Sequence, residues 1–67
     1  MPFSPSKFRE KAQESGRSCG EISVAAGRSY PTVQGYLHGN ITPPLEVAER
    51  LARAVECELT DLLESDQ

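Results

Sequence analysis

The sequence predicts an all-α fold made of five short helices. Apolar residues recur at helical spacing along most of the chain, and no segment alternates apolar and polar residues as a strand would. Serine or proline precedes the first four helical segments and glycine follows three of them, which is typical of helix starts and ends. The predicted helices cover about residues 5–15, 19–26, 30–38, 44–55 and 59–64 of a single domain that spans residues 1–67.

The first helix is predicted from its start and its end. Ser4 is a typical N-cap, and Pro5 stands at the first helical position, where its missing N–H does no harm. Phe3 and Phe8 then fall at the two ends of a hydrophobic staple, which fixes how the chain enters the helix. Gly16 ends the helix, because glycine turns the chain back without a Cβ clash.

The second and third helices are short and follow each other closely. Residues 18–21 (SCGE) form a capping box, in which the serine and glutamate side chains bond to each other's backbone, and Gly27 ends the helix. Ser29 is the next cap, and Gly39 closes the third helix. Pro31 falls in the first turn of that helix, where proline is tolerated. The apolar positions of the third helix are Val33, Tyr36 and Leu37.

Residues 40–44 (NITPP) are predicted to form a loop, because adjacent prolines lack donors and exclude a helix before them. The most regular amphipathic stretch of the chain follows this loop. Its apolar positions are Leu45, Ala48, Leu51, Ala52 and Val55. A short terminal helix carries the last apolar group, which comprises Cys57, Leu59, Leu62 and Leu63.

The charge of the chain is divided unevenly. A length of 67 residues with 37% hydrophobic residues allows one small core and no second domain. The net charge of −3 disfavours nucleic-acid binding when taken as an average. However, residues 1–40 carry five basic and three acidic side chains, whereas residues 41–67 carry two basic and seven acidic ones. One half of the chain can therefore face DNA while the other faces away.

The sequence predicts neither an enzyme nor a metal protein. Cys19, His38 and Cys57 are the candidate ligands and nucleophiles, and their spacing matches no metal-binding or catalytic pattern. We therefore expect no catalytic residue, metal, cofactor or small-molecule ligand. No signal-peptide core or membrane-length apolar run is present, so we expect a cytoplasmic protein without membrane contact. A disulfide between the two cysteines stays open, although small secreted scaffolds normally carry more cysteines.

Two short helices joined by a tight, glycine-containing turn form the layout of a helix-turn-helix. Over about residues 8–63 the sequence resembles the Cro/repressor-type (XRE-like) family. The family pattern has serine and glutamate opening the second helix, Ala-Gly at the turn, an apolar residue and a glycine beyond it, a proline, and a leucine-rich helix. The positions that match in register are Ser18, Glu21, Ile22, Ala26, Gly27, Ser29, Thr32, Val33, Gly39, Pro43, Leu45, Leu51, Ala52, Ala54, Leu59, Leu62 and Leu63.

The chain departs from the family pattern at a few positions. Leu37 stands where glutamate is frequent, and Gly20 weakens the second helix by about 1 kcal/mol relative to alanine. The other departures are Arg17, Cys19 and Ser23. The resemblance still implies a compact, five-helix lambda-repressor-like domain, whose second and third helices form the helix-turn-helix.

The resemblance also implies which residues contact DNA bases. In such domains the third helix lies in the major groove, which points to Tyr30, Pro31, Thr32, Gln34 and Gly35 as its outer side. The Gln34 amide suits a bidentate pair with adenine, and Thr32 and Pro31 suit a thymine methyl group. A duller interpretation stays open for each: Gln34 and Thr32 as solvated polar residues, and Tyr30 as a lid over the motif.

Phosphate contacts are expected around the same two helices. The free N–H groups and the dipole at the start of the second helix favour an anion near Ser18 and Cys19. Arg17 and Arg28 flank the motif, or are ordinary surface charges, and the loop after the third helix lacks lysine and arginine. The full expected phosphate-contacting set is Arg17, Ser18, Cys19, Arg28, Ser29, His38, Asn40 and Thr42.

The function predicted from this resemblance is sequence-specific binding of double-stranded DNA by a transcriptional regulator. The short length resembles small phage Cro proteins or bacterial repressors, which favours repression. Weak binding by one domain favours a homodimer on paired half-sites, with its surface near Cys57 and Leu59. The alternative is a helix-turn-helix used for protein contact, as in an antitoxin-like module, which the acidic C-terminal half favours.

Overall fold

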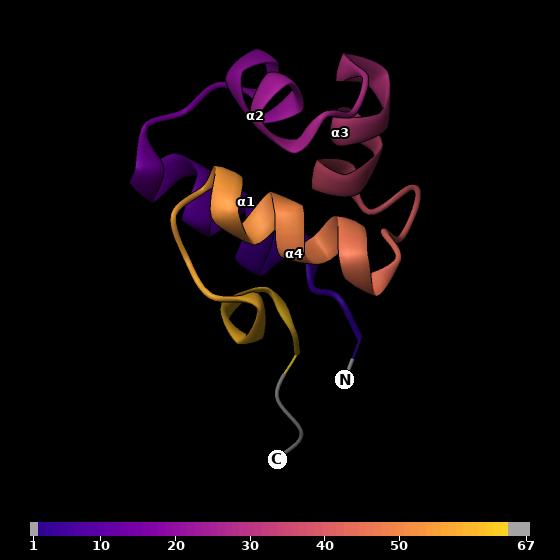
Figure 1. Cartoon of the computed structure of the whole chain (residues 1–67). Helices are drawn as coiled ribbons and strands as arrows, with labels where there is room; N and C mark the ends of the chain where they lie inside the picture. The colour runs from indigo at the N-terminus through magenta and orange to yellow at the C-terminus, as the bar shows by residue number, and fades with distance from the viewer. Residues whose placement is uncertain (1, 65–67) are drawn as a thin grey trace.

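The computed structural model describes residues 2–64, which form four α-helices and one short 3₁₀-helix (Figure 1). The helices are α1 (Pro5–Ser15), α2 (Cys19–Ala26), α3 (Tyr30–His38), α4 (Leu45–Ala54) and η1 (Leu59–Leu62). The first three bounds are as predicted, and α4 is slightly shorter than predicted. The first residue and the last three residues of the predicted domain lie outside the described residues.

The prediction of a fifth α-helix over residues 59–64 is wrong. A four-residue 3₁₀-helix stands there, and Leu63 is extended, with φ −102° and ψ 147°. Leu63 forms an antiparallel bridge with Phe3, while the Ser4 N–H donates to the Leu62 carbonyl at 2.7 Å. The end of the chain therefore pairs with its beginning, and this pairing replaces the helical hydrogen bonds that residues 59–64 would otherwise make.

The predicted helix starts are largely confirmed. Ser4 Oγ accepts the Lys7 N–H, and the rings of Phe3 and Phe8 meet edge to face with centroids 5.6 Å apart. The capping box of α2 is also present (residues 18–21). The side chain of Ser29 differs from the prediction, because it makes no capping bond and its hydroxyl pairs with Thr32 Oγ1 at 2.7 Å.

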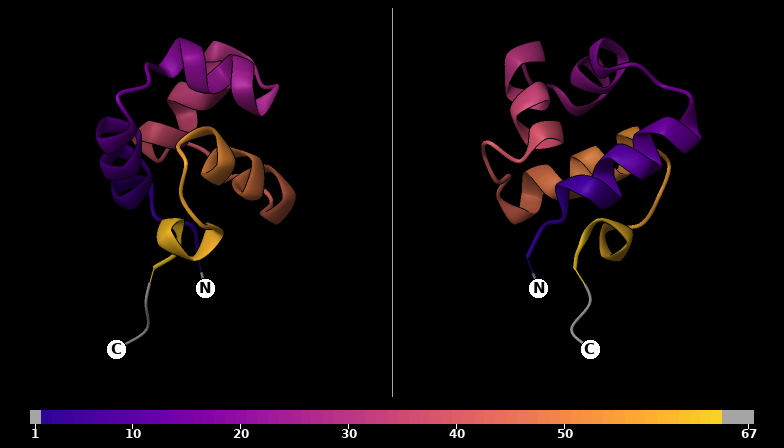
Figure 2. Two further views of the ribbon diagram at one scale, coloured as in Figure 1. Left: turned by 60° about the vertical axis from the view of Figure 1, so that its left-hand side comes forward. Right: turned by 180° about the vertical axis from the view of Figure 1, so that it is seen from behind.

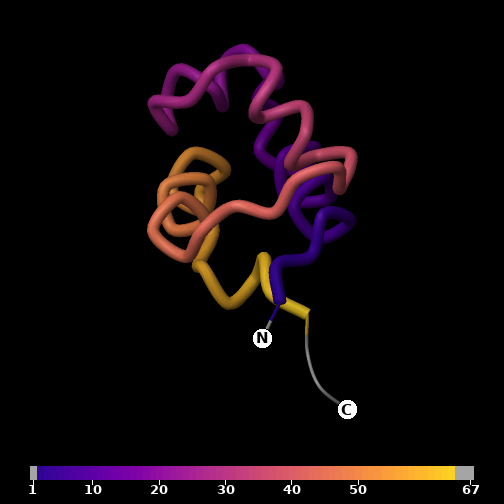
Figure 3. Tube along the Cα trace, turned by 90° about the vertical axis from the view of Figure 1, so that its right-hand side faces the viewer, coloured from indigo at the N-terminus to yellow at the C-terminus, as the bar shows by residue number. Residues whose placement is uncertain are grey.

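The core is built from one face of every helix. Its largest fully buried side chains are Phe8, Ile22, Val33, Leu51 and Leu62, one from each element. Helix α2 packs on α3 and α4, whereas α1 packs on α3 and η1. Figures 1 and 2 show α2 and α3 together at one end of the molecule, with the start of α1 and η1 near the other. The trace in Figure 3 shows α1 and α4 on opposite sides below them. This packing of the helices leaves one side of α3 uncovered.

Within residues 2–64, no helix is both long enough and apolar enough to cross a lipid bilayer.

Candidate nucleic-acid interface

Helix α3 is anchored on one side and open on the other. Val33 is fully buried and Tyr36 nearly so, which fixes the inner face of the helix in the core. Pro31 and Gln34 are exposed, and Thr32 is half-buried. The polar flank that was predicted to read bases therefore faces solvent, apart from one residue.

That residue is Gly35, whose predicted place on the outer face is wrong. Gly35 is buried, and its carbonyl accepts the Asn40 N–H at 2.9 Å. A Cβ built on Gly35 would lie 2.7 Å from Cγ1 of Ile41. The loop after α3 thus folds back over the helix at the point where no side chain stands, a close approach that glycine permits.

Gly35→Ala is expected to be less favourable than helix propensity suggests. Alanine exceeds glycine by about 1 kcal/mol in a helix interior, but the new methyl group would displace Ile41. In an Ile41→Ala background the displaced atoms are gone. Gly35→Ala should then raise the free energy of unfolding by at least about 0.5 kcal/mol more than it does in the wild type. Urea denaturation of the four proteins checks this coupling, and strict additivity would contradict the contact.

Tyr30 and Gln34 form a pair on the outer side of α3. Gln34 Nε2 donates to Tyr30 Oη across 3.5 Å, one helical turn apart. The ring of Tyr30 is 49% exposed, and its Cε2 lies 4.0 Å from where a Cβ on Gly20 would stand. Tyr30 therefore lies at the junction of α2 and α3, where its hydroxyl accepts from the Gln34 amide.

The start of α2 offers unbonded donors. The Glu21 N–H donates to Ser18 Oγ at 3.2 Å, and the Ser18 N–H donates to Glu21 Oε1 at 2.9 Å. The N–H groups of Cys19 and Gly20, in the first turn, have no acceptor among residues 2–64. These donors, at the positive end of the helix dipole, suit a phosphate oxygen. The Glu21 carboxylate nearby opposes an anion.

The two arginines that flank the motif differ in their surroundings. Arg17 donates to the Ala54 carbonyl at 2.8 Å and to Glu56 Oε1 at 3.1 Å, so it ties the start of α2 to the end of α4. A phosphate contact by Arg17 would require release of these bonds. Among residues 2–64, the guanidinium of Arg28 donates only to the adjacent Gly27 carbonyl, at 3.3 Å, and can reach a phosphate at lower cost.

The remaining phosphate candidates lie at the two ends of α3. Ser29 precedes the helix and is exposed, although its hydroxyl is shared with Thr32. His38 is the last residue of the helix, Asn40 and Thr42 follow it, and all three are exposed. The start of α2 lies beside the start of α3, because Cys19 Sγ stands 4.0 Å from the Tyr30 carbonyl oxygen. The candidates therefore lie at both ends of α3, as expected of contacts that flank a groove.

Arg9 is a supporting residue that the sequence did not reveal. Its guanidinium donates to the Leu37 carbonyl, in the last turn of α3. A cation at this position is stabilised by the negative end of the helix dipole. The same bond ties α1 to α3. Helical spacing does not reveal this contact, because Arg9 and Leu37 are 28 positions apart.

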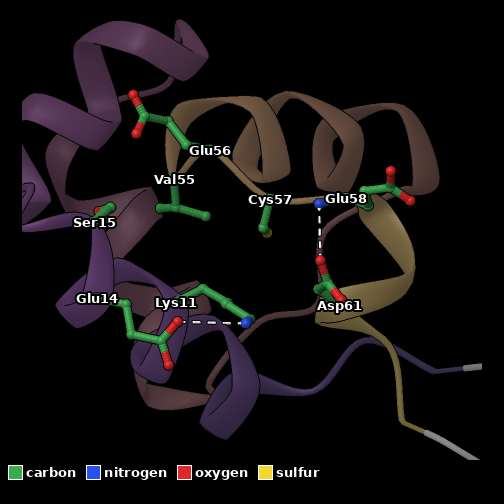
Figure 4. A pocket seen from close by; sticks show the side chains of 8 residues that line it. All are labelled: Lys11, Glu14, Ser15, Val55, Glu56, Cys57, Glu58 and Asp61. Carbon is green, nitrogen blue, oxygen red and sulfur yellow. Dashed lines mark hydrogen bonds and ion pairs between the residues drawn. The ribbon is translucent and has the colours of Figure 1, made fainter.

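A separate hollow of about 590 Å³ lies among α1, the end of α4 and η1 (Figure 4). In it Glu14 accepts from Lys11 at 3.4 Å, and Asp61 accepts from the Glu58 N–H at 3.0 Å. Burial, reinforced by Asp61, raises the pKa of the Cys57 thiol. No group of three His, Cys, Asp or Glu residues suited to a metal occurs in the described part of the chain. This hollow is acidic and therefore poorly suited to DNA.

Both cysteines are free thiols, so the disulfide alternative is not realised in this structure. Burial raises the pKa of Cys19, which keeps less of it in the reactive thiolate form. The predicted dimer surface at Cys57 and Leu59 is less exposed than expected, because both side chains are half-buried against the core. The most exposed large apolar side chain of residues 2–64 is instead Val24, at 83%.

Comparison with known families gives a match that covers nearly the whole chain. The profile of the Cro/C1-type HTH DNA-binding domain matches residues 7–67. No curated protein matches the sequence.

Proposed function

The chain belongs to the Cro/C1-type helix-turn-helix DNA-binding domains, and from this premise we propose that it is a sequence-specific transcriptional regulator, acting as a repressor. Helix α3 lies in the major groove, with Gln34 and Thr32 toward base edges. The observation that carries the proposal is the two-sided character of α3. Val33 and Tyr36 fix the helix in the core, while Pro31 and Gln34 are exposed to solvent.

Tyr30 assists Gln34 in this arrangement. Its hydroxyl accepts one N–H of the Gln34 amide, which leaves the second N–H and the amide oxygen for a bidentate pair with adenine. A side chain held before binding loses less rotamer entropy on binding. The structure thus favours an adenine opposite Gln34 as the most strongly read base.

Phosphate contacts position the domain on the duplex. We assign them to the N–H groups of Cys19 and Gly20, to Arg28, and to the exposed polar residues after α3. Few of these groups carry a positive charge, so one copy binds weakly. Two copies on adjacent half-sites add their contacts, and we propose that the regulator acts in this form. The role is binding to an operator and exclusion of polymerase, without catalysis.

A salt titration tests the proposal. The logarithm of the affinity for duplex DNA should fall with the logarithm of salt concentration, with a slope of about −3 or steeper for a paired complex. Arg28→Ala should make the slope shallower by about 1 for each copy bound. Arg53→Ala removes the same charge from α4 and serves as the matched control, with an unchanged slope. A wild-type slope near zero would reject DNA binding and leave the protein-contact alternative.

A further inference from the structure

A shallow groove between α2 and α4 combines apolar and basic groups. It encloses about 410 Å³ and is lined by Val24, Ala25, Ala26, Gly27, Arg50 and Arg53; this set is called the α2/α4 groove below. Val24 is 83% exposed, although α2 buries Ile22 and Ala26 on its opposite side. Exposed aliphatic side chains are common singly, but here Val24 and Ala25 lie next to each other and also line a neighbouring apolar hollow.

The two arginines of the groove hold no ion partner among the described residues. Arg50 and Arg53 are exposed and stand one turn apart on α4. The salt bridges formed within residues 2–64 are Lys11–Glu14 and Arg17–Glu56, so neither involves them. Arg50 Nη1 lies 3.9 Å from where a Cβ on Gly27 would stand, which places its guanidinium at the C-terminal end of α2.

No carboxylate lines the groove, although the chain as a whole is acidic. Glu49 and Glu58 line an adjacent hollow that Arg53 also borders, so the carboxylates stand on the other side of Arg53 and not within the α2/α4 groove. Although the sequence holds ten acidic residues and has a net charge of −3, the residues that line this groove include two guanidinium groups and no acid. Its own charge favours an anionic partner.

We propose that the α2/α4 groove binds an acidic segment of another protein, which places an aliphatic side chain on Val24 and Ala25 and carboxylates on Arg50 and Arg53. Guanidinium groups bind carboxylates in bidentate pairs. Nucleic acid also pairs with arginine, but its phosphates and sugars offer no apolar partner to Val24. Val24 would then stay exposed to water, or would lose its water without gaining an apolar contact. The groove shares no residue with the proposed DNA contacts, so the proposal is independent of them.

The test uses the full chain and a random peptide library displayed on phage. Enriched peptides should carry aspartate or glutamate beside an aliphatic residue. Synthetic copies of them should bind the double variant Arg50→Glu/Arg53→Glu at least about tenfold more weakly than the wild type, and Val24→Ser more weakly as well. Lys11→Glu reverses a charge in the acidic hollow and is the control, with unchanged affinity. Thermal unfolding verifies that each variant is folded.

Charge reversal on both sides gives a second readout that loss of folding cannot produce. A peptide whose acids are replaced by lysine should bind the double variant better than it binds the wild type. Enriched peptides without an acidic bias, or binding unaffected by the double variant, would overturn the proposal. Sedimentation that shows the chain self-associating through these arginines would overturn it too, because a second copy would then occupy the groove.

Discussion

Replacing Gln34 by glutamate is expected to lower the affinity for a selected duplex by about thirtyfold or more. The new side chain has almost the same shape, but it cannot donate to adenine N7 and brings a negative charge beside the phosphates. Like charges brought together at an interface cost several kcal/mol, and a loss of about 2 kcal/mol corresponds to about thirtyfold. Fluorescence anisotropy with a labelled duplex measures this loss.

Gln13→Glu provides the matched control for this substitution. It makes the same chemical change at an exposed position of α1, outside the proposed interface. Both variants lower the net charge equally, so a general electrostatic effect would weaken both to the same degree. An equal loss in the two variants would contradict the assignment of α3 as the reading helix. Because Gln34 is exposed, the midpoint of thermal unfolding should stay close to the wild type in both.

The second large effect concerns the support of α3. Leu51 is fully buried at the centre of α4, on which α2 packs. Leu51→Ala leaves a cavity and should lower the free energy of unfolding by about 3 kcal/mol. A domain of this length has only about 3–10 kcal/mol of stability, so the variant should be largely unfolded or close to it at 37 °C. Urea denaturation followed by circular dichroism measures the change.

Leu45→Ala removes the same atoms from the same helix and is the control. Leu45 is 63% exposed at the first position of α4, so its truncation should cost no more than about 0.5 kcal/mol. Equal costs at the two positions would mean that the described packing of α4 is wrong. The difference between the two losses of stability measures how much the packing of the helices behind α3 depends on the buried Leu51 side chain.

The start and end of α1, α2 and α3 could be predicted because their signals are local. The caps Ser4 and Ser18 and the glycines that follow all three helices act within a few residues, and Gly16, Gly27 and Gly39 all have positive φ. The predicted exposure of Gln34 follows from the same logic, since a helix with Val33 and Tyr36 inward turns Gln34 outward. Sequence pattern thus located most of the outer face of α3.

What the sequence could not predict depends on contacts between distant segments. The bridge between Phe3 and Leu63 pairs residues from opposite ends of the sequence and lies where the fifth helix was predicted. Arg17 finds its carbonyl partner 37 positions away, and the burial of Gly35 depends on how a loop closes over it. None of these follows from helical periodicity, because periodicity places residues on faces and does not say which face meets which loop.

Selection of binding sites from a pool of random duplexes tests the central claim most directly. Wild-type protein and a Gln34 variant, such as Gln34→Ala, are each taken through selection, and the enriched sites are sequenced. If α3 reads bases through its outer flank, the wild type enriches a defined site, and the variant loses preference at one or two adjacent base pairs while the rest of the site is kept. Absence of any enriched site, or identical sites for the two proteins, would contradict the account.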